Sequence, residues 1–275
     1  MPEAPEVQTV LSTLETQIKD LEILSCQVLY NKIVSYPDSI RFCEEIQGQH
    51  FRNFRRLGKY LIFELDDLDL IVHLRMEGKF YLFDQPKTDK HIHVQFFLSD
   101  GRVMCYHDTR KFGRMQLYAH RQDPFQHPCF EHIGKDVLDP EFNSEYLYAK
   151  IHKCKKNLKS CLLDQSIVAG IGNIYADEIC FSALLDPRSR ANRISKKDCE
   201  NIVFHTKRIM KGAMKAGGTT IRSYTSSLGV TGLFQLKLKV HSRKGELCPV
   251  CQAPIKKITV SQRGTYLCPN CQKRK

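Results

Sequence analysis

The sequence predicts an α+β fold, in which an N-terminal antiparallel β-sandwich carries one leading helix and precedes a helical region and a zinc ribbon. Three observations support this prediction. Short apolar runs joined by turns fill residues 24–120, helical periodicity follows over residues 143–216, and two cysteine pairs lie near the end of the chain. The 275 residues suffice for one large domain or two ordinary ones.

The first helix is predicted by apolar side chains that recur at helical spacing: Val7, Val10, Leu11, Leu14, Ile18 and Leu21. Pro5 suits the first turn, where its missing N–H costs no hydrogen bond. Glu3 and Glu6 stand at the positive end of the helix dipole, which favours acidic side chains. We therefore expect a helix close to the N-terminus.

Two pairs of apolar runs predict β-hairpins. Residues 60–63 and 70–72 flank Asp66-Asp67, and residues 93–98 and 103–106 flank Ser99-Asp100-Gly101. Strands that return by hairpins form antiparallel sheets, which we expect to pack as a sandwich.

The second half of the chain is predicted to be helical. A Pro- and His-rich stretch at residues 123–140 indicates a linker, and Gly217-Gly218 should end the last helix. Residues 219–236 are rich in Ser, Thr and Gly, which is typical of a mobile loop.

Composition excludes several classes of protein. The chain is 42% hydrophobic and 26% charged, which is typical of a globular protein and not of a disordered or collagen-like one. No run approaches the ~20 apolar residues of a membrane-spanning helix, and the N-terminus does not resemble a secretory signal. We therefore expect a cytoplasmic protein with no membrane partner, whose 12 cysteines are thiols or metal ligands.

The net charge of +12 is concentrated near the C-terminus. Residues 206–275 hold 15 Lys and Arg but one acid, Glu246, a balance of +14. This asymmetry indicates a polyanionic partner, most simply nucleic acid. Charge alone supports a solvated basic tail equally well.

The two C-x2-C pairs predict one structural Zn²⁺. Sixteen residues separate the pairs, which fits a zinc ribbon, and the four ligands would be Cys248, Cys251, Cys268 and Cys271. Four thiolates leave no open position, so the ion should not activate water. The other eight cysteines are expected to be buried apolar side chains. Arg263, beside a glycine at the predicted tip of the hairpin between the pairs, is either a phosphate contact or an ordinary exposed arginine.

The N-terminus carries a candidate nucleophile. A penultimate residue as small as Pro2 usually permits removal of Met1, which would free a secondary amine. Such an amine can attack the anomeric carbon of a sugar and form an iminium ion, while Glu3 moves protons. The alternative is that Met-Pro is a common start and Glu3 only a helix-dipole partner.

Three further positions have both a functional and a structural interpretation. Lys59 precedes an apolar strand, where burial would lower its pKa, although a lysine with its ammonium in solvent is commoner. Phe112 is either a core residue or a wedge for a base stack. Gly170-Ile171-Gly172-Asn173 either lets the backbone approach a phosphate or is a plain turn between helices.

Taken together, the motifs resemble those of one family. They stand in one order: PEAPEV at 2–7, LGKYL at 57–61, HLRMEG at 73–78, YHDTRKFG at 106–113, GIGNIYADE at 170–178, and the four-cysteine finger. The chain resembles the bacterial formamidopyrimidine-DNA glycosylases, also called 8-oxoguanine-DNA glycosylase/AP lyases, from residue 2 to 273.

The resemblance implies four parts: an N-terminal catalytic β-sandwich domain (1–125), a helix–two-turn–helix domain (136–218), a loop that closes over the flipped base (219–236) and a zinc finger (239–273). Damaged double-stranded DNA would be the partner, bound between the halves. We expect a monomer with no obligate protein partner.

The resemblance also implies roles for single residues. Pro2 would be the Schiff-base nucleophile, Glu3 the proton donor, Lys59 the residue of β-elimination, and Arg263 a phosphate contact that assists δ-elimination. Met76, Arg110 and Phe112 match residues that fill the gap left by the everted base, and further DNA contacts match His91, Lys159 and Asn173. His241-Ser242 departs from the usual Tyr-Gly and puts one aromatic phosphate contact in doubt, and Ala4 replaces a usual Leu.

The implied enzyme is a bifunctional DNA glycosylase and AP lyase of base excision repair. One alternative is an oxidised-pyrimidine glycosylase of the endonuclease VIII type, against which the motifs around Met76 and Phe112 argue. A non-enzymatic zinc-finger DNA-binding module is the other. It would explain the basic C-terminus but not Pro2-Glu3 or Lys59.

Overall fold

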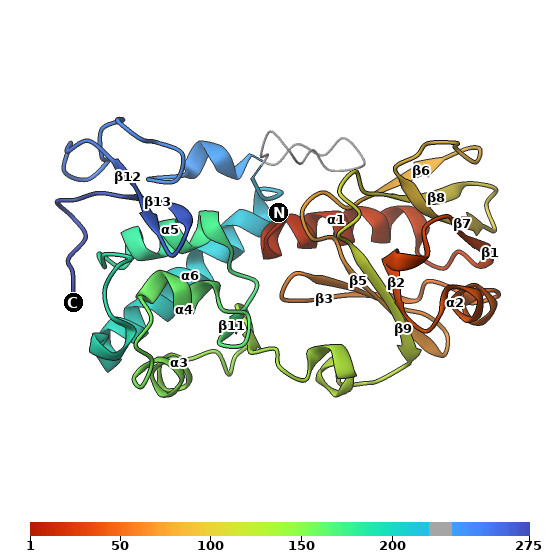
Figure 1. Ribbon diagram of the computed structural model, residues 1–275, viewed down its shortest axis with the longest axis horizontal. Coiled ribbons are helices and arrows are strands. Elements are labelled where there is room, and N and C mark those ends of the chain that lie inside the picture. The colour runs from red at the N-terminus through yellow and green to blue at the C-terminus, as the bar shows by residue number, and fades with distance from the viewer. Residues whose placement is uncertain (220–232) are drawn as a thin grey trace. The chain divides into compact units, whose positions relative to one another are not determined.

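The computed structural model describes residues 1–219 and 233–275 and divides into two compact units (Figure 1). The first unit holds residues 1–131 and, after the last helix, residues 217–219. The second holds residues 132–216 and 233–275. Of the predicted loop at 219–236, residues 220–232 lie outside the described residues. Within the described ranges, no helix has the length and hydropathy needed to cross a bilayer.

The first unit is a sandwich of two sheets. The four-stranded sheet has the order β1-β7-β8-β6, made of Ile23–Val28, Ile92–Leu98, Val103–His107 and Lys79–Phe83. The five-stranded sheet has the order β2-β9-β5-β4-β3, made of Val34–Tyr36, Arg114–Ala119, Leu68–His73, Tyr60–Glu64 and Asn53–Leu57. The antiparallel prediction is confirmed for every neighbouring pair except β2 and β9, which run in parallel.

Both predicted hairpins are present. Strands β4 and β5 flank Asp66-Asp67, and β7 and β8 flank Ser99-Asp100-Gly101, where Gly101 adopts a φ of +88°. The central strands β4, β5, β7 and β8 are buried along most of their length, and one large core includes residues of both sheets.

The leading helix α1 spans Ala4–Ile18 and supplies one stripe of that core. Its predicted apolar residues Val7, Val10, Leu11, Leu14 and Ile18 are buried with Phe63 and Val72 of one sheet and Phe96 and Met104 of the other. Leu21 lies beyond the helix, which ends before Asp20 takes a φ of +63°. A short helix, α2 (Ser39–Ile46), and a 3-10 turn (Asn31–Ile33) bury Phe42, Ile46 and Ile33 in the same core.

The predicted linker contains two 3-10 turns, Pro124–Gln126 and Pro128–Phe130. The buried Asp69 of β5 anchors this stretch, because its carboxylate lies 2.9 Å from His120 Nδ1 and 2.7 Å from His127 Nε2.

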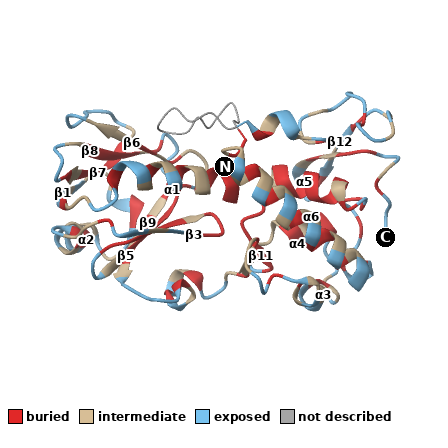
Figure 2. Ribbon diagram, turned by 180° about the vertical axis from the view of Figure 1, so that it is seen from behind, coloured by how far each residue is buried: buried red, intermediate tan, exposed pale blue. Residues whose placement is uncertain are grey.

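The second unit is mainly helical: α3 (Ser144–Ile151), α4 (Leu158–Leu163), α5 (Asn173–Ser182) and α6 (Lys196–Lys215). A parallel pair, β10 (Lys135–Asp136) and β11 (Val168–Ala169), and 3-10 turns at Ala191–Arg193 and Phe234–Lys237 complete it. Helix α5 is buried along most of its length (Figure 2). Gly217 follows α6 with a φ of +73°, which confirms the predicted helix end.

The finger is a hairpin of β12 (Lys256–Val260) and β13 (Arg263–Leu267), with the cysteine pairs on either side of it. Val240 and Ile255 pack with Cys248 and Cys268 in a small separate core that also includes Phe181 of α5.

Candidate active site and nucleic-acid interface

The first turn of α1 is held by the Glu6 carboxylate. Glu6 Oε2 accepts a hydrogen bond from the backbone N–H of Glu3 at 2.9 Å, and Oε1 accepts from the backbone N–H and hydroxyl of Thr219 at 2.7 and 2.9 Å. The adjoining Gly218 has a φ of +74°, and a Cβ there would lie 2.8 Å from Glu6 Oε1. Pro2 and Glu3, the predicted nucleophile and proton donor, are therefore buried in a fixed turn.

The charges around this turn place Lys59 near the N-terminus. Burial lowers the pKa of the Met1 α-amino group, opposed by Glu3 and Glu6, while Lys59 lowers this pKa further. Lys59 follows Gly58 in the β3–β4 turn and is only 5% exposed. Pro2, Glu3 and Lys59 thus belong to one buried region of the first unit.

A buried histidine, His73 at the end of β5, lies in the same region. Burial, together with the nearby charges of Arg75 and Lys59, lowers the pKa of His73 to about 3. Its Nδ1 accepts a hydrogen bond from the backbone N–H of Arg75 at 2.9 Å, and its ring meets Tyr60 edge-on. His73 is therefore a neutral neighbour of Lys59 at physiological pH.

The predicted gap-filling residues share one cavity of about 490 Å³. Met76, Arg110 and Phe112 line it together with Met1, Arg75 and Arg114. Asp108, fully buried, orders the segment by accepting hydrogen bonds from the backbone N–H groups of Arg110, Phe112 and Gly113 at 2.8–2.9 Å. One exposed aromatic ring and three guanidinium groups therefore line the same cavity. Guanidinium groups bind backbone phosphates and an aromatic ring can fill a gap in a base stack, so this lining suits a DNA strand with one base everted.

His91 stands apart from this cavity lining. Its ring centroid lies 5.6 Å from that of His107, and its backbone N–H donates to Asp89 at 2.8 Å. Its Nδ1 is buried and has no hydrogen-bond partner within the described ranges. Its predicted DNA contact stays a prediction.

The four predicted metal ligands converge. Their sulfur atoms lie within 4.8 Å of one another, and Cys248 and Cys268 are fully buried. This donor set fits a structural zinc ion in tetrahedral coordination. The expectation that the other cysteines are buried is wrong for Cys26, Cys43, Cys129 and Cys154, whose side chains are partly exposed.

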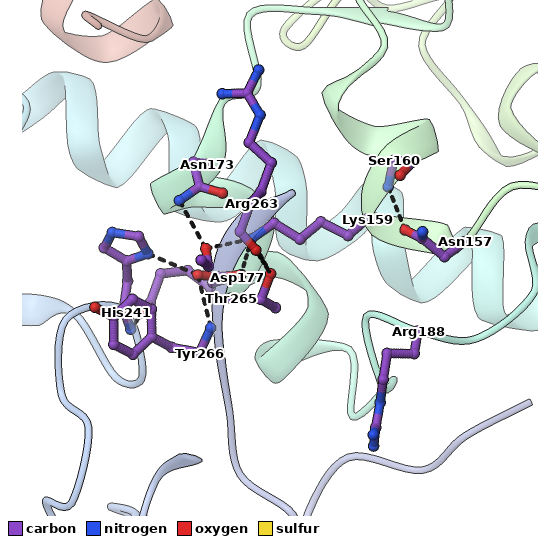
Figure 3. Close-up of polar contacts among 12 residues, drawn as sticks. Asn157, Lys159, Ser160, Asn173, Asp177, Arg188, His241, Arg263, Thr265 and Tyr266 are labelled. Carbon is purple, nitrogen blue, oxygen red and sulfur yellow. Dashed lines mark hydrogen bonds and ion pairs between the residues drawn. The ribbon is translucent and has the colours of Figure 1, made fainter. Parts of the chain in front are cut away.

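Arg263 is exposed but does not form the tip of its hairpin. Ser261 and Gln262 form the turn, with φ values of +46° and +62°, and Arg263 begins β13. The glycine beside it, Gly264, lies within the strand, where its carbonyl accepts a hydrogen bond from Asn173 Nδ2 at 3.1 Å. Asn173 and Arg263, two predicted DNA contacts, are thus brought together (Figure 3).

Lys159, the remaining predicted contact, is 1% exposed. Its ammonium donates to Asp177 Oδ1, Thr265 Oγ1 and the Gly264 carbonyl, at 2.7, 2.9 and 3.2 Å (Figure 3). An ammonium has three N–H donors, so these three acceptors use all of them.

Sequence reasoning missed the acids that organise the site: Glu6, Asp108 and Asp177. Glu6 and Asp108 lie inside recognisable motifs, but Glu6 has its partner Thr219 213 residues away, and the turn that Asp108 holds by three backbone N–H groups has no periodic pattern. Asp177 lies in a helix buried on nearly all sides, where no polar periodicity marks it.

Three models of known protein families match successive segments of the chain. Models of the formamidopyrimidine-DNA glycosylase N-terminal domain, the formamidopyrimidine-DNA glycosylase H2TH domain and a zinc finger found in FPG and IleRS match residues 1–115, 133–225 and 245–274.

Relatives match over their full length. The formamidopyrimidine-DNA glycosylase of Lactobacillus helveticus is 43% identical, with 99% of each chain covered, and that of Oceanobacillus iheyensis is 41% identical, with 100% and 99% covered. Crystal structures of Lactococcus lactis Fpg with DNA containing an abasic site and with DNA containing N7-benzyl-Fapy-dG are each 37% identical and cover 99% of this chain and 100% of theirs, with TM-scores of 0.89 and 0.90.

Proposed function

The chain belongs to the formamidopyrimidine-DNA glycosylase family, and on that premise we propose that it excises oxidised purines from double-stranded DNA and then cleaves the strand. The substrates would be 8-oxoguanine and formamidopyrimidines. The observation that supports this proposal best is the burial of Pro2, Glu3 and Lys59 in the unit that also carries the Met76–Arg110–Phe112 cavity.

A damaged base within a duplex must leave the stack before chemistry begins. Eversion costs a few kcal/mol, which wedge residues and phosphate contacts offset. Phe112 and Met76 would occupy the vacated stack, while Arg110 holds the backbone. Asp108 keeps the Arg110–Gly113 segment in one conformation, which lowers the entropic cost of binding.

With Met1 removed, the Pro2 nitrogen would bond to the anomeric carbon while the bond from that carbon to the base breaks and the base leaves with the electron pair. The proton that the Pro2 nitrogen loses neutralises the departing base. Opening of the C1′–O4′ bond then gives the iminium ion, with Glu3 as the donor of the proton that the sugar oxygen takes up. The buried carboxylate of Glu6 fixes the turn from which both groups act.

The iminium ion acidifies C2′, so loss of a C2′ proton expels the 3′ phosphate, and loss of a C4′ proton then expels the 5′ phosphate. Lys59 would serve the first elimination and Arg263 the second. Hydrolysis of the iminium ion, in which water adds to the former anomeric carbon, frees Pro2. The zinc ion would only fold the finger that carries Arg263.

A cleavage assay on three duplexes tests this proposal: 8-oxoguanine opposite cytosine, thymine glycol, and a preformed abasic site. We expect cleavage at 8-oxoguanine and at the abasic site, with phosphates at both ends of the gap. Preference for thymine glycol would instead indicate the endonuclease VIII type, and binding without cleavage of any duplex would indicate a DNA-binding module.

A further inference from the structure

The Asp177 carboxylate joins three segments of the second unit that are distant in sequence (Figure 3). From α5, its Oδ1 accepts a hydrogen bond from Lys159 of α4 at 2.7 Å. Its Oδ2 accepts from the backbone N–H of Tyr266 in β13 at 3.1 Å and lies 2.8 Å from His241 Nδ1. One side chain therefore ties α4, β13 and the start of the finger to α5.

From this carboxylate, a continuous path of hydrogen bonds leads to the backbone of Arg263. Lys159 Nζ donates to Thr265 Oγ1 at 2.9 Å, and the Thr265 hydroxyl donates to the Arg263 carbonyl at 2.9 Å. Since an ammonium can only donate, the hydroxyl proton must point toward Arg263. Both hydrogen bonds of the path are therefore donated in the direction from Lys159 to Arg263.

Neighbouring groups fix the same strand. Lys159 also donates to the Gly264 carbonyl, which accepts from Asn173 as well. Lys159 and Asp177 are 1% and 0% exposed, whereas Arg263 is exposed and its side chain extends away from the network (Figure 3). The buried pair therefore holds the backbone from which an exposed guanidinium projects.

We propose that Lys159 and Asp177 are positioning residues that set the place of Arg263, and that Lys159 acts through this network and not by touching DNA. The inference rests on the proposed function, because it gives Arg263 the δ-elimination step. It differs from the contact that the sequence motif implies for Lys159, since all three of its donors already have protein acceptors.

The test compares full-length, zinc-loaded variants: Lys159→Met, the double variant Lys159→Met/Asp177→Leu, and Arg263→Ala. Lys156→Met is the matched control, because Lys156 lies three residues earlier, just before α4, has a side chain that is 61% exposed, and pairs with Asp164 outside the network. The readouts are the ratio of δ- to β-elimination product on an abasic duplex, the salt dependence of DNA affinity, the Tm, and hydrogen exchange of the β13 amides.

We expect Lys159→Met and Arg263→Ala each to lower the δ/β ratio by about tenfold, with the first cleavage by Lys159→Met within about twofold of wild type. Its salt slope should match that of wild type, whereas Arg263→Ala should reduce the slope by about 1. The double variant should recover part of the Tm that the single variant loses, since removing both members of a buried pair is better tolerated than removing one. The recovery is partial because the Tyr266 N–H and His241 also lose their acceptor. It should not recover the ratio.

Two results would overturn the inference directly. A reduced salt slope in Lys159→Met with an unchanged ratio would show a direct phosphate contact. Recovery of both Tm and ratio in the double variant would show a merely structural pair. If Arg263→Ala itself leaves the ratio unchanged, the proposed role of Arg263 fails. In that case, hydrogen exchange decides whether Lys159 positions the strand. If the β13 amides of Lys159→Met are as well protected as those of Lys156→Met, the positioning role is rejected; if they exchange faster, it is supported.

Discussion

The Arg110 guanidinium lies 4.8 Å from the centroid of the Phe112 ring, over an aromatic side chain that is 48% exposed. The buried carboxylate of Asp108 holds both residues by their backbone N–H groups. Phe112 therefore presents an exposed ring from a fixed backbone, which is the arrangement that a wedge in a base stack requires.

Phe112→Ala should slow the removal of 8-oxoguanine from a duplex by about tenfold or more, and leave cleavage at a preformed abasic site within about twofold of wild type. The reason is that an abasic site has no base to evict, so a wedge contributes little there. Single-turnover rates on the two substrates measure the difference.

Phe204→Ala is the matched control, because Phe204 is also an exposed phenylalanine beside an arginine, with Arg208 5.7 Å from its ring centroid on α6. This variant should affect neither substrate. Equal losses on both substrates in Phe112→Ala would contradict a wedge role.

Borohydride should trap a covalent adduct between Pro2 and an abasic or 8-oxoguanine duplex. Reduction converts the iminium ion into a stable amine, and peptide mapping should find the DNA on a fragment that begins at Pro2. Lys59→Met serves as the comparison and should still form the adduct, because its proposed step follows iminium formation. An adduct on a lysine, or full activity in a protein that retains Met1, would refute the mechanism.

Cys248→Ser should lose zinc and weaken DNA binding by about tenfold or more, because a structural zinc ion contributes folding energy directly. Metal analysis and a binding titration measure both effects. Cys129→Ser, in the first unit and outside the ligand set, should change neither. Full zinc content with unchanged affinity in Cys248→Ser would disprove the role of the finger.

His73 should make the protein less stable in acid. Its folded pKa of about 3 lies below the ordinary value of 6.5, so between these values the unfolded chain binds a proton that the folded protein does not. The resulting loss of stability grows as the pH falls from 6.5 toward 3 and is on the order of a few kcal/mol.

His73→Gln retains an acceptor for the Arg75 N–H but has no proton to gain. Urea unfolding at pH 7 and pH 4.5 should therefore show a smaller decrease in the free energy of unfolding for this variant than for wild type. His132→Gln, at an exposed position, should behave as wild type. Parallel curves for wild type and His73→Gln would show that His73 does not carry the effect.

Local patterns predicted the parts of the fold that depend on neighbouring residues. The leading helix, the turns at Asp66-Asp67 and Ser99-Asp100-Gly101, and the four cysteine ligands all follow from spacing within a few residues. The position of Arg263 was predicted less well, because Gly264 resembles a turn glycine, whereas Ser261 and Gln262 take the left-handed conformations.

The sequence did not predict which distant segments contact one another. Nothing in the sequence distinguishes the buried Lys159 from a solvated lysine, since its burial depends on Asp177 and Thr265, which lie 18 and 106 residues away. The same is true of Glu6, whose partner Thr219 is set by tertiary packing. A buried polar residue whose partners lie far away along the chain leaves no periodic signal in the sequence.

The two residues of the β12–β13 turn should differ in how freely they vary in sequence. Both have positive φ, which costs a non-glycine residue about 1 kcal/mol or more. At Gln262, a change to glycine relieves this cost, so such a change should persist under selection for thermal tolerance. At Ser261, the side-chain oxygen accepts hydrogen bonds from Asn157 Nδ2 and Ser160 Oγ, each at 2.9 Å, and glycine would forfeit both. Randomising the pair should therefore enrich glycine at the second position and retain a small hydroxyl or amide side chain at the first.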